Sequence, residues 1–401
     1  MILKNQGRFT KTILTMHGKI TFSRTMLIGI DAETTAELKK VTGESSVFPL
    51  DCALGIDKIP FKMTPRMTLA VAREGVRAKS YKEAAITLKE RFHEDFSPDL
   101  VRNVTDHIGE IVWEDDQSHA KQAEEWLKTA KIDLRRRSRD VNDVIVIGTD
   151  GAYLDTREES WKETKIGLCY CLKDMYTWQC KNGEIGRRIT KKDLVAYIGK
   201  SDDFKYHFLA LALRNNIYMH NQIISITDGA PWIKSLISEL FPTAIHILDL
   251  YHVKERIAKF GKIHIRGKHR KAAWIESVNK LIEEGKIDEA LEMIEPYSNK
   301  KNKDDDTNLY AYISKRKDQM KYDVFREKGY PVGSGAQESA NKYGMQDRMT
   351  LQGQRWKKER GQGVLALKCR YESNRWDTVE SLVFKHYGTL MAQIVVSVTS
   401  G

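Results

Sequence analysis

The stretch VIVIGTDGAYLDTR, residues 144–157, decides the fold of this chain of 401 residues. Residues 144–147 form an apolar, β-branched run of the kind that fills the middle of a sheet. Asp150 and Gly151 follow this run, and a glycine lets a ligand or another backbone approach closely. The pattern predicts a buried strand that ends on a carboxylate.

A second stretch, QIISITDGAPW (222–232), repeats this arrangement with Asp228 and Gly229. If the two strands are neighbours, the carboxylates of Asp150 and Asp228 converge. Two carboxylates repel each other unless a cation lies between them, and both are ionised at neutral pH because their ordinary pKa is about 4. Mg²⁺ or Mn²⁺ is the natural companion of such a pair. Asp-Gly after a strand is also ordinary turn chemistry, which is the alternative for each copy.

The segments around these two strands follow an α/β pattern. The order is three strands, a helix, and then strand, helix and strand, which is the order of a ribonuclease-H-like sheet. The predicted fold class is therefore α/β, with a ribonuclease-H-like core whose first part covers residues 141–252. The further elements that we expect are strands over 165–172, 175–180 and 244–250, and helices over 191–214 and 231–240.

The first 60 residues are predicted to form a small β-rich region. Residues 15–24 alternate between polar and apolar side chains on both sides of His17-Gly18, which is typical of a hairpin. Residues 47–56 close this region.

Residues 61–140 are predicted to be helical and to bind DNA. Ser80 and Glu83 form a capping box that begins one helix, and Ser97-Pro98 begins the next. Two short helices joined by the segment HEDF predict a helix-turn-helix, whose second helix enters a major groove. The alternative is a plain helical hairpin.

Two further details bear on this helical region. Asp99 and Asp106 lie in its second helix and weaken the interpretation as a DNA reader, since acids repel phosphates. The charged segment LRRRSRD (134–140) is predicted to end a connecting helix.

Composition excludes several classes of protein. With 41% hydrophobic residues the chain can bury a large core over two or three domains. It has no run of about 18 apolar residues for a membrane span, and its first residues lack the features of a signal peptide. Its five cysteines form no paired framework, and Cys169 and Cys171 alternate in a strand-like run that favours burial over metal binding. A reducing, cytoplasmic setting fits.

The charge favours nucleic acid as a partner. The 66 Lys and Arg against 55 Asp and Glu give a net charge of +11, and the excess gathers in residues 254–271 and 342–375. Basic stripes release counterions from phosphates, although a solvated basic face is the alternative. Trp356 is a candidate for stacking on an unpaired base, with a buried helix tryptophan as its alternative. The candidate DNA-binding residues are Arg102, Lys262, Arg266, Lys268, Arg355, Trp356 and Lys357.

A third acid follows a glycine-rich loop in YPVGSGAQESANK (330–342). The loop residues Gly333, Ser334 and Gly335 are followed by Glu338, which we expect in the first turn of a helix. There it can face the sheet edge, while the free N–H groups of the helix start favour a nearby phosphate. The alternative is an ordinary acidic residue at a helix start.

Several segments together resemble bacterial insertion-sequence transposases of the Kra type, a DDE group related to the mutator-like and Lre-type transposases. The similarity extends to VFPLDCALGI and SYKEAAITLKERF, and so covers most of the chain. The joint pattern is specific, although each piece alone is weak. The segments are DGAPWI (228–233), ILDLYHVKE (247–255), YPVGSGAQESANK (330–342), QRWKKERGQGVLALK (354–368) and SNRWD (373–377).

The resemblance implies a DNA transposase in which two Mg²⁺ (or Mn²⁺) ions serve strand cleavage and strand transfer. By motif, the three metal-binding and catalytic acids are Asp150, Asp228 and Glu338. The resemblance also implies a helical insertion over 253–330, which the polar linker 299–306 interrupts, and a C-terminal helical part of the core over 331–401.

Asp249 and His252 form the D-x-x-H of the mutator-related families. The resemblance implies a catalytic His252 near the scissile phosphate, with Asp249 near the metal or orienting His252. The alternative is a strand-end aspartate and a helix-capping histidine. The implied partners are the inverted repeats of the element and the target DNA, bound by a homodimer or larger oligomer at the bacterial nucleoid.

One departure from the family is plain. Many relatives carry a CxxC metal knuckle before the segment that matches VFPLD, whereas residues 32–46 here contain no cysteine. The alternatives in other classes are a catalytically silent DNA-binding regulator derived from a transposase, and a ribonuclease-H-like nuclease.

Overall fold

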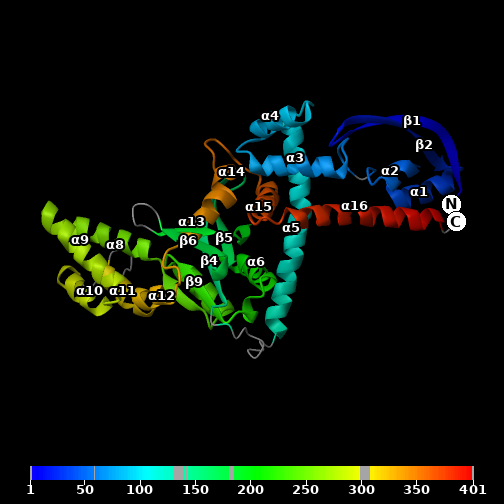
Figure 1. The fold of residues 1–401 in the computed structure, drawn as a ribbon. Helices are drawn as coiled ribbons and strands as arrows, with labels where there is room; N and C mark the ends of the chain where they lie inside the picture. The colour runs from blue at the N-terminus through cyan, green and yellow to red at the C-terminus, as the bar shows by residue number, and fades with distance from the viewer. Residues whose placement is uncertain are drawn as a thin grey trace. The chain divides into compact units, whose positions relative to one another are not determined.

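A computed structural model of the protein describes residues 2–57, 59–130, 140, 142–179, 185–298 and 308–399. Two predictions fall mainly outside them: the end of a connecting helix over 134–140 and the polar linker over 299–306. The chain forms two compact units, each built from separated segments (Figure 1). Unit 1 comprises Met1–Gln117, Asp155–Ser160 and Met345–Gly401, and unit 2 comprises Ser118–Leu154 and Trp161–Gly344.

Unit 2 contains a mixed five-stranded sheet with the order β10-β9-β4-β5-β8. Strand β9 pairs in parallel with both β4 and β10, whereas β5 and β8 are antiparallel. The predicted α/β class is therefore correct, and the two Asp-Gly strands are neighbours as predicted. The strands are β4 (Val144–Thr156), β5 (Ser160–Cys171), β8 (Asp193–Ile198), β9 (Gln222–Thr227) and β10 (Ile245–Leu248).

Two helices cover one face of this sheet. Helix α6 (Ser201–Arg214) follows β8, and α7 (Pro231–Leu240) lies between β9 and β10. Ile145 and Ile147 of β4 belong to the same hydrophobic cluster as Phe204 and Phe208 of α6. Because side chains alternate along a strand, Asp150 belongs to the opposite face from these isoleucines.

Three predictions about the sheet are wrong in detail. Strand β4 does not end at Asp150 but continues to Thr156, so Asp150-Gly151 is not a turn. The helix predicted over 191–214 begins only at Ser201, because DLVAYI (193–198) is rich in β-formers and Gly199 has φ +156°. The strand predicted over 175–180 is β6 (Met175–Gln179), which pairs with β7 (Ile185–Ile189) in a separate sheet; Cys180 lies outside the described residues.

Short and medium helices follow β10 in the described part of 253–330, where the resemblance implied a helical insertion. Residues 328–334 connect them to the helix that carries Glu338. These helices are α8 (Leu250–His264), α9 (Lys268–Glu283), α10 (Ile287–Ile294), α11 (Leu309–Ser314), α12 (Tyr322–Glu327) and α13 (Gly335–Asn341).

Unit 1 begins with the predicted hairpin of β1 (Leu3–Thr15) and β2 (Gly18–Gly29). The short β3 (Ser46–Val47) extends this sheet. The β-rich prediction for residues 1–60 is incomplete, because α1 (Ala32–Thr42) and α2 (Pro49–Ala53) also lie there. An unforeseen capping box explains α1, since the Asp31 side chain accepts from the Thr34 N–H at 2.8 Å and the Thr34 hydroxyl accepts from the Asp31 N–H at 3.1 Å.

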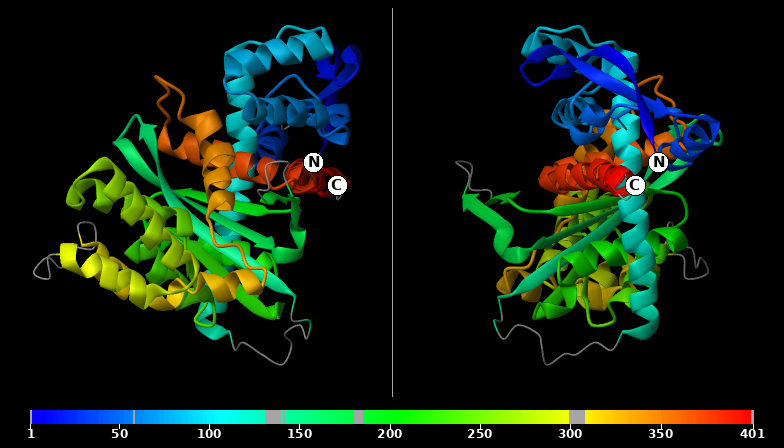
Figure 2. Two further views of the ribbon diagram at one scale, coloured as in Figure 1. Left: turned by 60° about the vertical axis from the view of Figure 1, so that its left-hand side comes forward. Right: turned by 90° about the vertical axis from the view of Figure 1, so that its right-hand side faces the viewer.

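Three further helices are α3 (Pro65–Arg77) and α4 (Tyr81–Phe92) of unit 1, and α5 (Pro98–Thr129), which belongs to unit 1 up to Gln117 and to unit 2 beyond it. Ser80 and Ser97 cap α4 and α5 as predicted. The helix-turn-helix with two short helices is wrong, because α5 is one continuous helix of 32 residues, the long cyan helix of Figures 1 and 2. Val104 and Ile108 on its inner face are fully buried.

The C-terminal helices α14 (Asp347–Met349), α15 (Lys358–Glu372) and α16 (Trp376–Thr399) belong to unit 1 and not to the sheet unit. Their attachment has a visible cause. A Cβ at Gly109 of α5 would lie 2.7 Å from the backbone of Gly363 in α15, so the two helices cross with backbones in contact. The buried Arg370 of α15 also pairs with Asp115 and Asp116 of α5.

Two predictions drawn from composition concern membrane spans and the burial of cysteines. No described helix is long and apolar enough to cross a membrane. Cys169 is buried as predicted, and Cys171 is half-buried, with its Sγ 4.0 Å from His220 Nε2.

Candidate active site

The strand register of unit 2 brings three aspartates to one edge of the sheet. Val144 to Ile147 pair with Gln222 to Ser225, and Asp150 and Asp228 each lie three residues beyond the last of these pairs. Asp249 follows β10, and its N–H donates to the carbonyl of Thr227 at 2.8 Å. The carboxyl ends of parallel strands share an edge, which is where open α/β sheets bind ligands.

Asp150 carries the electrostatic signature of a functional carboxylate. Burial raises its pKa, the nearby Asp228 carboxylate raises it further, and hydrogen bonds from the Gly151 N–H and Asn341 oppose both. The Gly151 N–H lies 2.7 Å from Oδ1, and the Asn341 amide donates to Oδ2. A raised pKa from burial and a like charge is typical of sites that work on a charged ligand.

Asp228 lies on a rigid turn between β9 and α7. Its Oδ1 accepts from the Ala230 N–H at 2.9 Å, and its carbonyl accepts from the Tyr312 hydroxyl at 3.3 Å. Gly229 has φ +88°, and a Cβ there would lie 2.8 Å from Leu248 Cδ1. Glycine is therefore required next to Asp228 for both backbone and space.

A cationic and aromatic cluster lies behind this turn. The guanidinium groups of Arg256 and Arg316 lie 4.2 and 4.3 Å from the ring centroid of the buried Tyr312. Arg316 also donates to the carbonyl of Gly229 at 3.3 Å. The helical segment after β10 thus supports the second acid of the site.

Asp249 is fully buried and connects two elements. It caps α8 by accepting from the Tyr251 N–H at 2.7 Å, and it accepts from the Ser334 N–H at 3.1 Å and from the Ser334 hydroxyl. Its Oδ2 also lies 3.0 Å from Nδ1 of His252. Burial raises the pKa of Asp249, but the hydrogen bonds from His252 and Ser334 outweigh it and lower the pKa overall.

His252 is the positive partner in this cluster. Its hydrogen bond to Asp249 raises its pKa against the effect of burial, and the charges of Asp249 and Asp228 act in the same direction. The side chain of His252 remains 43% exposed, so it can meet a ligand. The geometry agrees with Asp249 as the residue that orients His252, since both Asp249 oxygens are engaged within the protein.

We expect the Asp249–His252 pair to stabilise the protein most strongly within a limited range of pH. The lowered pKa of Asp249 means that its contribution is present above about pH 3.8 and is lost as pH falls through the folded pKa. The raised pKa of His252 means that its contribution is present below pH 6.5 and is lost as pH rises through the folded pKa.

We therefore expect the stability difference between the wild type and His252→Gln to be largest between about pH 4 and 6.5. Urea unfolding of both proteins over pH 3–9 measures it. A difference that does not change with pH would show that the pair does not contribute through its charges.

Glu338 lies in the first turn of α13, as predicted, and its side chain is exposed. Ser334, four residues before it, bonds Asp249, and Asn341, three residues after it, bonds Asp150. Residues spaced three or four apart share a helix face, so Glu338 lies between two contacts to the other acids of the site. Gln337 points into the sheet instead, where its amide donates to the carbonyl of Ile166.

Oxygen ligands for a divalent cation are available at this edge. The carboxylates of Asp150 and Asp228 are the hard donors that Mg²⁺ prefers, and their mutual repulsion is what a cation relieves. As the described side chains stand, no group of three or more His, Cys, Asp or Glu is arranged to hold a metal ion. Asp150, Asp228 and the exposed Glu338 are the residues that would hold one.

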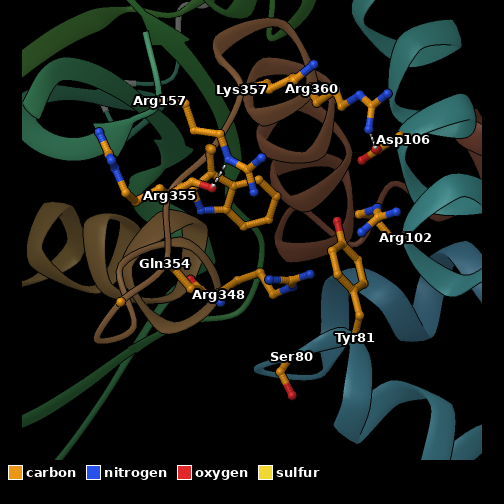
Figure 3. Close-up of a pocket in the computed structure, with 12 residues that line it drawn as sticks. Ser80, Tyr81, Arg102, Asp106, Arg157, Arg348, Gln354, Arg355, Lys357 and Arg360 are labelled. Atoms are coloured by element: carbon orange, nitrogen blue, oxygen red, sulfur yellow. Dashed lines mark hydrogen bonds and ion pairs between the residues drawn. The ribbon is translucent and has the colours of Figure 1, made fainter. Parts of the chain in front are cut away.

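The predicted DNA-binding residues fall into two groups. Lys262, Arg266 and Lys268 are exposed where α8 meets α9 in unit 2. Arg102, Arg355, Trp356 and Lys357 line one cavity of unit 1 (Figure 3). Trp356 is only 9% exposed, and its Nε1 donates to the carbonyl of Met349 at 2.9 Å, so most of its ring is unavailable for a base.

Sequence reasoning missed two residues that hold the acids in place. Asn341 bonds Asp150, and Tyr312 bonds the backbone of Asp228. The signal for Asn341 was its spacing of four residues from Gln337, which predicts two amides on one face of α13. No local signal pointed to Tyr312, because its contact spans 84 residues of chain.

The chain belongs to the family described as "Uncharacterised protein family (UPF0236)", whose model matches residues 3–380. Among the curated proteins, none matches this sequence.

Proposed function

We propose that this protein is a DNA transposase of the DDE class that cleaves and joins DNA strands at the carboxyl edge of the unit 2 sheet. The observation that carries the proposal is that Asp150 and Asp228 follow matching positions of neighbouring parallel strands, close enough for the Asp228 charge to raise the pKa of Asp150, with Asp249 after the next strand. This arrangement gathers acids on neighbouring parallel strands, where a phosphodiester and divalent cations can meet.

The order of the strands supports a ribonuclease-H-like core for unit 2. Taken along the chain, the first three strands β4, β5 and β8 lie side by side, and β9 and β10 are added on the other side of β4. Helix α6 comes before β9 and α7 before β10. The order of three strands, a helix, and then strand, helix and strand is the predicted one, but its third strand is β8 and not the segment predicted over 175–180.

In the proposed mechanism Asp150 and Asp228 hold divalent cations, with Glu338 as the third acid. Mg²⁺ or Mn²⁺ bound there would activate water or a DNA 3′-hydroxyl and stabilise the leaving oxygen. Asn341 and the Gly151 N–H fix the orientation of the Asp150 carboxylate. Ser334 ties the loop before Glu338 to Asp249, which holds α13 at the same edge.

His252 would stabilise charge at the scissile phosphate. Its Nδ1 is engaged with Asp249, which leaves Nε2 for a phosphate oxygen. The raised pKa of His252 favours the imidazolium form, in which Nε2 carries a proton to donate. Asp249 is a positioning residue in this mechanism.

The net charge of +11 supports DNA as the partner. Exposed Lys262, Arg266 and Lys268 would contribute phosphate affinity that does not depend on sequence. The proposal includes the ends of the element and target DNA as substrates, a homodimer or larger oligomer as the assembly, and the cytoplasm of a bacterium, at its nucleoid, as the place of action.

The test is a strand-transfer assay on labelled ends of the DNA that flanks this gene, with a supercoiled plasmid as target. We expect cleavage at the ends and joining to the plasmid with Mg²⁺ and neither with EDTA. A duplex with scrambled ends is the control. Mg²⁺-dependent cleavage of both duplexes without joining would support a nuclease of the same fold instead, and binding without cleavage would support a DNA-binding regulator.

A further inference from the structure

A strongly cationic cavity of about 560 Å³ lies within unit 1, whereas the acids of the candidate active site belong to unit 2. Figure 3 shows its basic side chains, which come from α5, from the turn after β4 and from the segment around α14 and α15. The only acid among the lining residues is Asp106. The basic lining residues are Arg102, Arg157, Arg348, Arg355, Lys357 and Arg360.

Arg348 is the most unusual member of this cavity. It is 1% exposed, and its guanidinium lies 4.2 Å from the ring centroid of Tyr81 and 5.2 Å from that of Trp356. Its Nε donates to the carbonyl of Gly75 at 2.9 Å, whereas Nη2 is buried with no hydrogen-bond partner among the described residues. Burial lowers its pKa, as expected for a cation without a bonded carboxylate.

The other charges of the cavity leave a net positive site. Asp106 lies 3.5 Å from Arg360, and Arg102 is paired with Asp99 at 2.8 Å. The Nε of Arg102 is also buried and has no hydrogen-bond partner among the described residues. Leaving such donors unpaired costs free energy, which a bound anion would recover.

The volume of the cavity and the chemistry of its lining side chains limit which anion can bind there. A cavity of this volume lies within the usual range for small-molecule sites and exceeds what a bare inorganic ion fills. Arginine forks match phosphate oxygens, and Tyr81 and Trp356, which also line the cavity, offer an aromatic boundary for a base. A phosphate with an attached nucleoside fits this combination.

We infer that this cavity binds one nucleotide of an unpaired DNA strand, with its phosphate on Arg348 and the surrounding cations. The inference rests on the proposed function for the identity of the strand, and it adds to it a binding site separate from the acids of unit 2. Arg348 provides the buried contact, and Lys357 and Arg360 provide the exposed rim.

The test is fluorescence anisotropy with a labelled single-stranded oligonucleotide in EDTA, so that cleavage plays no part. We expect Lys357→Gln with Arg360→Gln to weaken binding by about tenfold or more and to lower the salt dependence. Arg8→Gln on β1, an exposed arginine of the same unit, is the matched control and is expected to bind as the wild type.

A substitution that is expected to strengthen binding distinguishes an effect on binding from damage to the fold. Asp106→Asn removes the only acid of the cavity, so we expect tighter binding of the oligonucleotide. A variant that merely disturbed the packing of α5 would bind more weakly. Equal affinity of the wild type, the rim double variant and Asp106→Asn would overturn the inference.

Competition identifies the source of the phosphate. We expect an unlabelled single strand, or a duplex with unpaired ends, to displace the probe at lower concentrations than thymidine monophosphate or a blunt duplex. Equal competition by the free nucleotide would overturn the assignment to a DNA strand. If the protein binds DNA through the cavity but cleaves none, the proposed function is wrong and this inference stands. If it cleaves DNA while the rim double variant binds normally, this inference is wrong and the proposed function stands.

Discussion

Replacing Asp150 by asparagine is expected to reduce Mg²⁺-dependent DNA cleavage by about a thousandfold or more and to leave DNA binding unchanged. The reason is that Asp150 supplies one of two carboxylates that follow paired positions of β4 and β9 and lie close enough for the Asp228 charge to raise the pKa of Asp150. Asparagine keeps the shape but has a single acceptor oxygen, so it can accept from Asn341 or from the Gly151 N–H and loses the other hydrogen bond together with the charge. Asp228→Asn is expected to have the same effect.

Whereas its cleavage activity falls, the stability of Asp150→Asn is expected to stay the same or to increase. Burial and the Asp228 carboxylate raise the pKa of Asp150 above its ordinary value, so ionisation of Asp150 opposes folding once the pH rises through the folded pKa. The variant should therefore unfold at the same or a higher urea concentration than the wild type at neutral pH. Binding, cleavage and urea midpoints are measured together.

Asp202→Asn, an exposed acid in the first turn of α6, is the matched control. It is expected to keep wild-type cleavage. Loss of stability in Asp150→Asn with full cleavage would assign Asp150 a structural role and remove the proposed chemistry.

Glu338→Gln is expected to reduce cleavage and joining by about a thousandfold while binding to end DNA persists. Glu338 is the candidate third acid because its helix contacts Asp249 through Ser334 and Asp150 through Asn341. If Glu338 were only a helix-start charge, the change would cost about 0.3–1 kcal/mol of stability and leave the chemistry intact. A gel assay of cleavage and joining distinguishes these outcomes.

Glu327→Gln at the end of α12 is the control for this change, since Glu327 is exposed and lies outside the loop at residues 331–334. Near-wild-type cleavage by Glu338→Gln would show that Glu338 is not the third acid, and Asp249 would be tested next. That test needs a stability measurement beside it, because Asp249 is fully buried and bonds both His252 and Ser334.

The pair of acids could be predicted because its determinants are local. Each lies directly after an apolar, β-branched run, and each is followed by a glycine. The predictions that were wrong fall where a single residue overrides a longer pattern. Gly199, with φ +156°, separates β8 from α6 inside a segment whose composition alone favours one helix.

Other features depend on contacts between distant segments, and no periodicity signals them. The crossing of α5 and α15 needs Gly109 and Gly363 together, and either glycine alone is unremarkable. The cavity around Arg348 likewise assembles from four parts of the chain. The basic residues were visible in the sequence, but their convergence on one buried arginine was not.

The helices between β10 and α13 leave the sheet, and the chain returns beside Asp249 just before α13. The Leu250 N–H donates to the carbonyl of Val332 at 3.0 Å. Two residues further along, the Ser334 N–H donates to Asp249 at 3.1 Å. Closing a loop costs entropy that rises only slowly with its length. The outer helices α9 and α10 can therefore be lengthened, trimmed or exchanged over evolutionary time with little effect on the acids. The number of residues between Asp228 and Glu338 then carries no catalytic information, and searches for related proteins should leave that interval open.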